Sequence, residues 1–201
     1  MIIEMINLDA IKTHEFLIGA ISPLPVTLIS TVDAEGRYNA APFSAVTPIS
    51  WKPPLICVSV GSKKGVKKDT AHNIEASGDF VINVMNEEFL KKTVQASGNY
   101  PRGVDEIAKV GLTALPSVKV KSPLIAEAQV SMECRLYQKM ELGEGENVRW
   151  LYFGEVLLAH VKDEILTSHT LDPLKFGALG YLGRDDRGKR IFCRTKDILR
   201  S

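Results

Sequence analysis

The residues best suited to chemistry lie in two neighbouring stretches, residues 40–50 and residues 62–70. The first, Ala-Ala-Pro-Phe-Ser-Ala-Val-Thr-Pro-Ile-Ser, has the composition of a β-strand, but Pro42 and Pro48 interrupt it. Because proline cannot donate to a sheet ladder, such a segment is predicted at a sheet edge or a bulge. Bulges leave backbone N–H groups unpaired and often lie beside functional sites. This stretch therefore offers hydrogen-bond donors to a ligand.

The second stretch places four lysines around the first turn of a helix predicted over residues 66–77. Ser62 is positioned to cap this helix and Gly78 to end it. Cations at a helix N-terminus oppose the macrodipole unless an anion offsets both, and a bound phosphate would also accept backbone N–H bonds. Thr70 and Asn73 would add a hydroxyl and an amide along the same rows. The alternative is a solvated lysine face. The four lysines are Lys63, Lys64, Lys67 and Lys68.

Length and composition describe an ordinary globular chain. Its 201 residues are expected to form one domain, 1–201, with 45% apolar and 24% charged residues and a net charge of +1. The absence of a global basic field makes nucleic acid a poor default partner. No apolar run is long enough to span a bilayer, and the N-terminus has an acid where a signal peptide needs a base. We expect a cytoplasmic protein.

Cysteine and histidine give little sign of catalysis. Cys57, Cys134 and Cys193 are widely spaced, and no Cys/His cluster predicts a metal site. Cys57 and Cys134 lie in strand-like runs, where cysteine behaves as a small buried hydrophobe; a redox role for Cys57 is the alternative. His160 alternates with apolar residues and is interpreted as structural, the alternative being contact with substrate or iron. No Ser/His/Asp set or carboxylate pair is evident, so no catalytic side chain is predicted.

Apolar alternation and frequent turns predict a mainly β fold, a β-barrel with a few helices. Strands are predicted over residues 25–32, 38–41, 55–60, 79–85, 124–142 and 148–161, and helices over residues 66–77, 86–96 and 105–110. The dinucleotide-binding pattern G-x-G-x-x-G is absent, which argues against a Rossmann sheet.

Linked motifs resemble the flavin reductase-like family, the FMN-binding split β-barrels that include flavoredoxins and archaeal ferric reductases. The motifs are N-x-A-P-F-S at 39–44, P-P-L at 53–55, K-D-T-x-x-N-I at 68–74 and D-F-V-I-N-V at 79–84. Further similarity at 100–113, 154–161 and 179–184 extends the resemblance over most of the chain. Each motif alone is weak, but their order along the chain is specific.

The resemblance implies an FMN site assembled from three groups of residues. Ala41, Pro42, Phe43 and Ser44 would line the isoalloxazine ring, Ser59, Val60 and Gly61 the ribityl chain, and Lys67, Thr70 and Asn73 the phosphate. The ring edge needs donors at fixed spacing, which N–H groups around Phe43–Ala45 would supply; a plain barrel corner is the alternative. The loop 100–105 and Tyr181 would close the pocket, from this subunit or from a partner. The resemblance also implies a homodimer with FMN near the interface.

The implied activity is an FMN-dependent NAD(P)H oxidoreductase. NADH or NADPH would reduce the bound FMN, which would pass electrons to free flavin, ferric complexes or a protein acceptor. The flavin supplies the chemistry and the protein orients it. One alternative is a non-enzymatic FMN-binding electron carrier or flavin store. Another is an oxidase of the pyridoxamine-phosphate type, whose phosphate ligands are typically arginines rather than lysines. The sequence leaves the acceptor and the preferred nicotinamide open.

Overall fold

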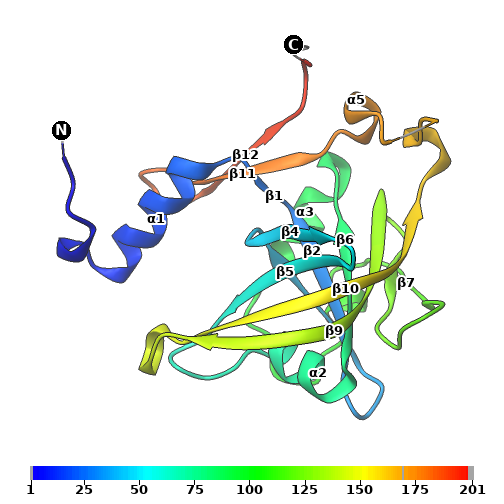
Figure 1. The fold of residues 1–201 in the computed structure, drawn as a ribbon, viewed down its shortest axis with the longest axis horizontal. Helices are drawn as coiled ribbons and strands as arrows, with labels where there is room; N and C mark the ends of the chain where they lie inside the picture. The colour runs from blue at the N-terminus through cyan, green and yellow to red at the C-terminus, as the bar shows by residue number, and fades with distance from the viewer. Residues whose placement is uncertain (1, 169, 199–201) are drawn as a thin grey trace.

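A seven-stranded antiparallel sheet forms the centre of the computed structural model, which describes residues 2–168 and 170–198 (Figure 1). Its strand order is β3-β2-β6-β9-β10-β5-β4. The strands are β2 (Thr27–Val32), β3 (Tyr38–Phe43), β4 (Val46–Trp51), β5 (Pro54–Gly61), β6 (Asp79–Val84), β9 (Val130–Leu142) and β10 (Arg149–Val161). The predicted mainly β architecture is confirmed.

Smaller elements surround this sheet. The α-helices are α1 (Ala10–Ile21), α2 (Asp69–Ser77), α3 (Leu90–Gln95), α4 (Glu106–Lys109) and α5 (Pro173–Phe176), and single 3-10 turns span Met5–Asn7, Glu87–Phe89, Gly145–Asn147 and Asp163–Ile165. Strands β1 (Leu24–Pro25), β11 (Leu179–Arg184) and β12 (Arg190–Arg194) make a second sheet, and β7 (Ala114–Leu115) pairs with β8 (Leu124–Ile125). Helix α1 lies beside the β11–β12 hairpin, away from the main sheet (Figure 1).

The two edge strands of the main sheet follow one another in the chain. Strand β3 ends at Phe43 and β4 begins at Val46, so only Ser44 and Ala45 separate opposite edges. The N–H of Ser59 donates to the carbonyl of Ala45 at 2.9 Å, which ties this link to β5. A sheet whose edges are two residues apart must curl until they meet, and this closes the barrel.

Both interrupting prolines lie on the edge strands, as predicted. The N–H of Ala40 donates to Glu106 Oε2 at 2.9 Å, so it points away from β2. Pro42 lies two residues further along β3, so its nitrogen faces the same way and costs no ladder hydrogen bond. On β4 the register shifts between Pro48 and Ser50, which is the expected bulge.

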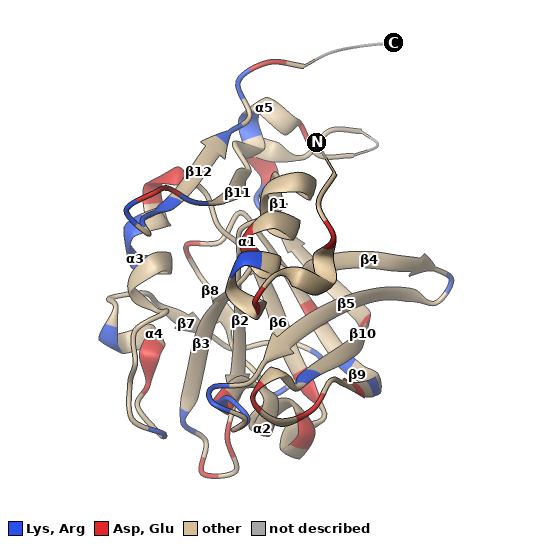
Figure 2. Cartoon of the chain, turned by 90° about the vertical axis from the view of Figure 1, so that its left-hand side faces the viewer, with Lys and Arg blue, Asp and Glu red and all other residues tan. Residues whose placement is uncertain are grey.

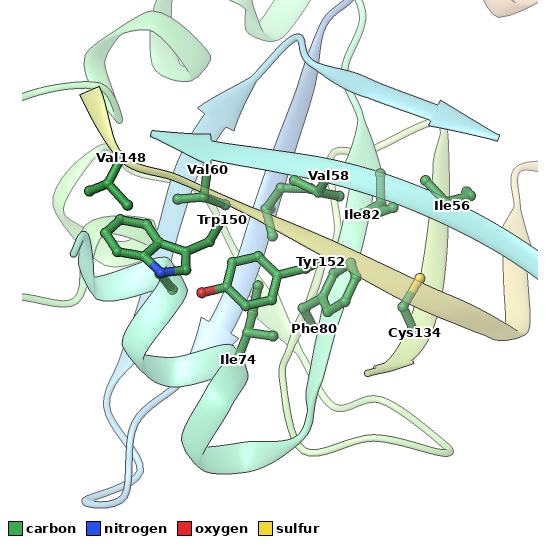
Figure 3. Packing of buried hydrophobic residues seen from close by; sticks show 12 residues of the cluster. Ile56, Val58, Val60, Ile74, Phe80, Ile82, Cys134, Val148, Trp150 and Tyr152 are labelled. Atoms are coloured by element: carbon green, nitrogen blue, oxygen red, sulfur yellow. The ribbon is translucent and has the colours of Figure 1, made fainter. Parts of the chain in front are cut away.

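The barrel interior is filled by side chains from the sheet and from α2. The rings of Phe80, Trp150 and Tyr152 gather above Ile74 of α2, which closes one end of the barrel (Figure 3). Gly154 makes this packing possible, because a Cβ there would lie 2.4 Å from Phe80 Cζ. A second apolar cluster lies behind β2 and β3, where α4 and the segments beside it cover the sheet. Strand β2 is therefore buried along its whole length.

Two buried carboxylates fasten the loop that precedes β8. Glu133 on β9 is fully buried and accepts hydrogen bonds from the backbone N–H groups of Val118, Lys119 and Val120. Asp79 at the start of β6 accepts from the N–H and the hydroxyl of Ser122 at 3.0 and 2.6 Å. Because buried carboxylates need such partners, this loop is held firmly against the sheet.

Several element boundaries differ from the sequence predictions. Helix α2 begins at Asp69, because residues 63–66 form a tight turn with Lys64 at a φ of 52°. The Ser62 hydroxyl donates to the Glu146 carbonyl and does not cap the helix; that prediction was wrong. Gly78 ends the helix in the left-handed conformation, as expected.

The remaining differences arise from turns and from a missed helix. The strand predicted over 124–142 is two strands, β8 and β9, separated by a turn. The helix predicted over 86–96 is a 3-10 turn followed by α3. The sequence analysis predicted no element over α1, and none of the residues of this helix is buried in the structure.

Candidate functional site

A pocket of about 730 Å³ opens between β3, the start of α2, the loop after α3 and the β11–β12 hairpin. This volume lies within the usual range for cofactor and small-molecule sites. Strand β3 is the edge strand beside which the two barrel edges meet, and α2 is the helix that closes the barrel. The pocket therefore lies where the fold leaves backbone groups without sheet or helix partners.

The β3 wall of the pocket carries free hydrogen-bond donors. Ala41, Pro42, Phe43 and Ser44 all line it. Among the described residues, the N–H groups of Ser44 and Ala45 have no acceptor, and neither has the Ser44 hydroxyl. These donors suit a flat ligand with acceptors along one edge.

The α2 wall combines free N–H groups with cations. The N–H groups of Asp69 and Thr70, at the first two positions of the helix, have no acceptor in the part of the chain that the structure describes. Lys68 reaches into the open pocket, with Nζ 5.9 Å from the centre of the Phe43 ring. The pKa of Lys68 is lowered, chiefly because burial disfavours its charged form and then because of the positive charges of Arg149 and Lys63. A bound anion would relieve this repulsion and accept the N–H bonds.

Lys67 lines the pocket but directs its charge elsewhere. Its Nζ lies 2.8 and 2.9 Å from the two carboxylate oxygens of Glu75 and 5.1 Å from the centre of the Trp150 ring. Glu75 also accepts the Tyr152 hydroxyl at 2.7 Å. Lys67 is therefore the better-partnered lysine of the two, whereas Lys68 has no carboxylate partner in the part of the chain that the structure describes.

The structure brings six of the ten predicted site residues together around the pocket. These are Ala41, Pro42, Phe43, Ser44, Lys67 and Thr70; the pocket does not include Ser59, Val60, Gly61 or Asn73. Val60 is packed in the barrel core, and the Asn73 amide donates to Thr31 Oγ1 at 3.0 Å. Tyr100 and Arg102 of the predicted closing loop, and Tyr181, line the pocket from this same chain.

A carboxyl group that the sequence did not single out also faces the pocket. The Asn39 amide lies between Thr70 Oγ1, at 3.2 Å, and Glu106 Oε2, at 3.0 Å; with its nitrogen toward Glu106 it donates to the carboxylate and accepts the Thr70 hydroxyl. Burial raises the pKa of Glu106 to about 7, although the hydrogen bond from the Ala40 N–H acts to lower it. The negative charges of Asp69 and Asp105 add to the rise. No sequence signal marks this contact, because 66 residues separate Ala40 from Glu106.

The cysteines and His160 lie outside the pocket. His160 Nε2 is 2.6 Å from the buried carboxylate of Glu133, which fits its structural interpretation. Cys134 is part of the barrel core. Cys57 is half-buried on β5, and burial raises the pKa of its thiol, which disfavours the reactive thiolate.

Within the described ranges, none of the helices has the length and hydropathy needed to cross a bilayer.

Residues 19–185 match the sequence model of a protein family, the flavin reductase like domain. That range includes most of the pocket, from β3 through the start of the β11–β12 hairpin.

Three known proteins illustrate the similarity. Nitrilotriacetate monooxygenase component B from Bacillus cereus is 27% identical, with a TM-score of 0.93 over 100% of this chain and 98% of that one. A structure with a split barrel domain from Shewanella frigidimarina has a TM-score of 0.83 at 21% identity, covering 98% and 94% of the two chains. NADH:riboflavin 5'-phosphate oxidoreductase from Streptomyces pristinaespiralis is 24% identical over 62% of this chain and 65% of its own. The fold is thus a split barrel, and the chain belongs to the flavin reductase-like family.

Proposed function

We propose that this protein is an FMN-dependent NAD(P)H oxidoreductase that passes electrons to free flavin, ferric complexes or a protein acceptor. The observation that carries the proposal is the pocket wall at the start of α2. There, the free helix N–H groups and Lys68, which has no carboxylate partner among the described residues, border a pocket whose other wall includes Ser44 with its free N–H and hydroxyl; the free N–H of Ala45 follows directly in the chain. A phosphate at one end and acceptors along a planar edge at the other are the features of FMN.

The residues present fit this cofactor. Ser44 and Ala45 would donate to the acceptor edge of the ring, and Phe43 would pack against the ring. Thr70 and the lysines Lys63 and Lys68 would hold the phosphate, together with the first N–H groups of α2. FMN, when bound, would supply the hydride and electron transfer. The name of the Streptomyces relative supports NADH as a donor and riboflavin 5'-phosphate as the flavin.

The first test is a visible spectrum of the purified protein, taken before and after anaerobic addition of NADH or NADPH. Oxidised-flavin bands that bleach would support the reductase. Bands that persist would favour an electron carrier reduced by another protein. A protein that takes up no flavin when FMN is added would refute the cofactor assignment.

The two neighbouring lysines provide a matched test of the phosphate site. Lys68→Ala removes an unpaired cation, and we expect FMN affinity to fall about tenfold, the effect of losing one charge-assisted contact. Lys67→Ala removes a cation that Glu75 already neutralises, and we expect a smaller loss. Fluorescence titration with FMN measures both affinities. Equal affinities in wild type and Lys68→Ala would exclude Lys68 as a phosphate ligand.

We also propose that the protein is a cytoplasmic homodimer. Helix α1 buries none of its residues, and it leaves Ile11, Phe16, Leu17 and Ile21 exposed. An isolated helix of this length is marginal in water, so a second subunit packing on this face would stabilise it. Sedimentation equilibrium distinguishes the dimer from a 22.1 kDa monomer.

A further inference from the structure

The β11–β12 hairpin presents two arginines to the pocket from the side opposite α2. Arg184 and Arg190 are direct cross-strand partners, and both line the pocket. Like charges facing each other across two strands are destabilising. Within residues 2–168 and 170–198, neither guanidinium has a carboxylate partner. An anion between them would remove this repulsion.

Local geometry keeps the nearby acids away from this pair. Asp185 accepts the N–H groups of Arg187 and Lys189 at 2.9 and 2.8 Å, so its carboxylate is engaged by the turn of the hairpin. The Arg184 guanidinium donates to the Gly188 carbonyl at 2.6 Å, which fixes its position. The turn between β11 and β12 carries both acidic and basic residues (Figure 2). Arg184 is thus held in place, and no carboxylate of the described residues neutralises either arginine.

An aromatic pair lies beside the arginines on the same hairpin. Tyr181 and Phe192 are cross-strand partners whose ring centroids are 5.5 Å apart, and both line the pocket. Side chains three residues apart on a regular strand point to opposite faces. A bulge between Tyr181 and Gly183, with Gly183 at a φ of 109°, changes this phase and brings Arg184 to the pocket with Tyr181.

Two aromatic rings next to two guanidinium groups that have no carboxylate partner in the described ranges suit a ligand with a ring and a phosphate. The free N–H groups and lysines at the start of α2 form a separate anion site in the same pocket, which the proposed FMN phosphate would occupy. On the basis of the proposed function, we propose that Arg184 and Arg190 bind a phosphate of the nicotinamide dinucleotide. That phosphate is either the 2′-phosphate, present in NADPH alone, or the pyrophosphate, present in both donors.

The test uses FMN-loaded protein and the variants Arg184→Gln and Arg190→Gln. Arg194→Gln is the matched control, because Arg194 lies on β12 but pairs with Glu87 at 2.8 Å and does not line the pocket. Calorimetric titration with ADP-ribose and with 2′-phospho-ADP-ribose measures binding without turnover. Steady-state oxidation of NADH and NADPH gives the corresponding KM values.

Each pocket variant should bind the compounds that carry the recognised phosphate about tenfold more weakly than wild type, as expected for the loss of one charge-assisted contact. A loss confined to 2′-phospho-ADP-ribose and NADPH assigns the 2′-phosphate, and an equal loss for all four compounds assigns the pyrophosphate. Unchanged affinities and KM values in both variants, with a wild type that oxidises either donor, would overturn this inference alone. A wild type that holds FMN but neither binds the probes nor oxidises a donor would overturn the proposed function as well.

Discussion

Replacing Glu133 with alanine is expected to lower the free energy of unfolding by about 3–5 kcal/mol, the cost of breaking a buried charged network. Glu133 is fully buried, and its carboxylate accepts three backbone N–H groups and contacts His160. The substitution removes the acceptor of three partly buried N–H groups, and each donor that loses its partner costs stability. Urea denaturation followed by circular dichroism measures the loss.

The control for this prediction is Glu155→Ala on the neighbouring strand β10. Glu155 pairs with Arg135 at 2.7 Å, but the Arg135 side chain is 63% exposed. Exposed pairs contribute less than about 1 kcal/mol, so this variant should remain close to wild type. Glu133→Gln, which keeps one acceptor oxygen, should fall between the two. A Glu133→Ala protein no less stable than Glu155→Ala would contradict the proposed anchoring of the loop before β8.

Replacing Glu106 with glutamine is expected to change how stability depends on pH. The carboxyl has an ordinary pKa of 4.5, which the folded protein raises to about 7. Between these values the unfolded chain has lost a proton that the folded chain retains, so wild-type stability falls as pH rises. Glutamine does not titrate, and its carbonyl still accepts the Ala40 N–H. The free energy of unfolding of the variant, relative to that of the wild type, should therefore rise by about 2 kcal/mol between pH 5 and pH 8.

Chemical denaturation at both pH values, without added flavin, tests this second prediction. Glu164→Gln is a suitable control, because Glu164 is exposed in the 3-10 turn Asp163–Ile165 and lies far from α4 in the sequence. Its difference from wild type should not change with pH. If the difference for Glu106→Gln is also constant between pH 5 and pH 8, the raised pKa is wrong.

Local sequence signals predicted the strands and the edge positions of the two prolines. Apolar alternation and turn residues are short-range features, and they marked the segments that became β2, β5, β6 and β10. The start of α2 was misplaced because the turn at residues 63–66 requires Lys64 in a conformation that lysine rarely adopts. Propensity favours the helical alternative there, and tertiary structure overrides it.

The parts of the site that were missed depend on contacts between distant segments. Glu106 reaches β3 only because α4 packs on that strand. Arg184 faces the pocket only because a bulge shifts the phase of β11. The different environments of Lys67 and Lys68 depend on Glu75, a residue of α2 whose carboxylate pairs with Lys67. No spacing rule contains this information, whereas six of the ten residues named from the motif resemblance line the pocket.

The two-residue link between β3 and β4 also bears on aggregation. Open sheet edges are templates on which other chains can add strands. Here the two edges of the main sheet are joined by Ser44 and Ala45, and each edge strand contains a proline that cannot donate to an incoming strand. The segment that offers donors to a ligand is thus flanked by edges poorly suited to recruiting another chain. The protein can keep unpaired backbone groups available for a ligand without exposing a long edge strand on which another chain could add.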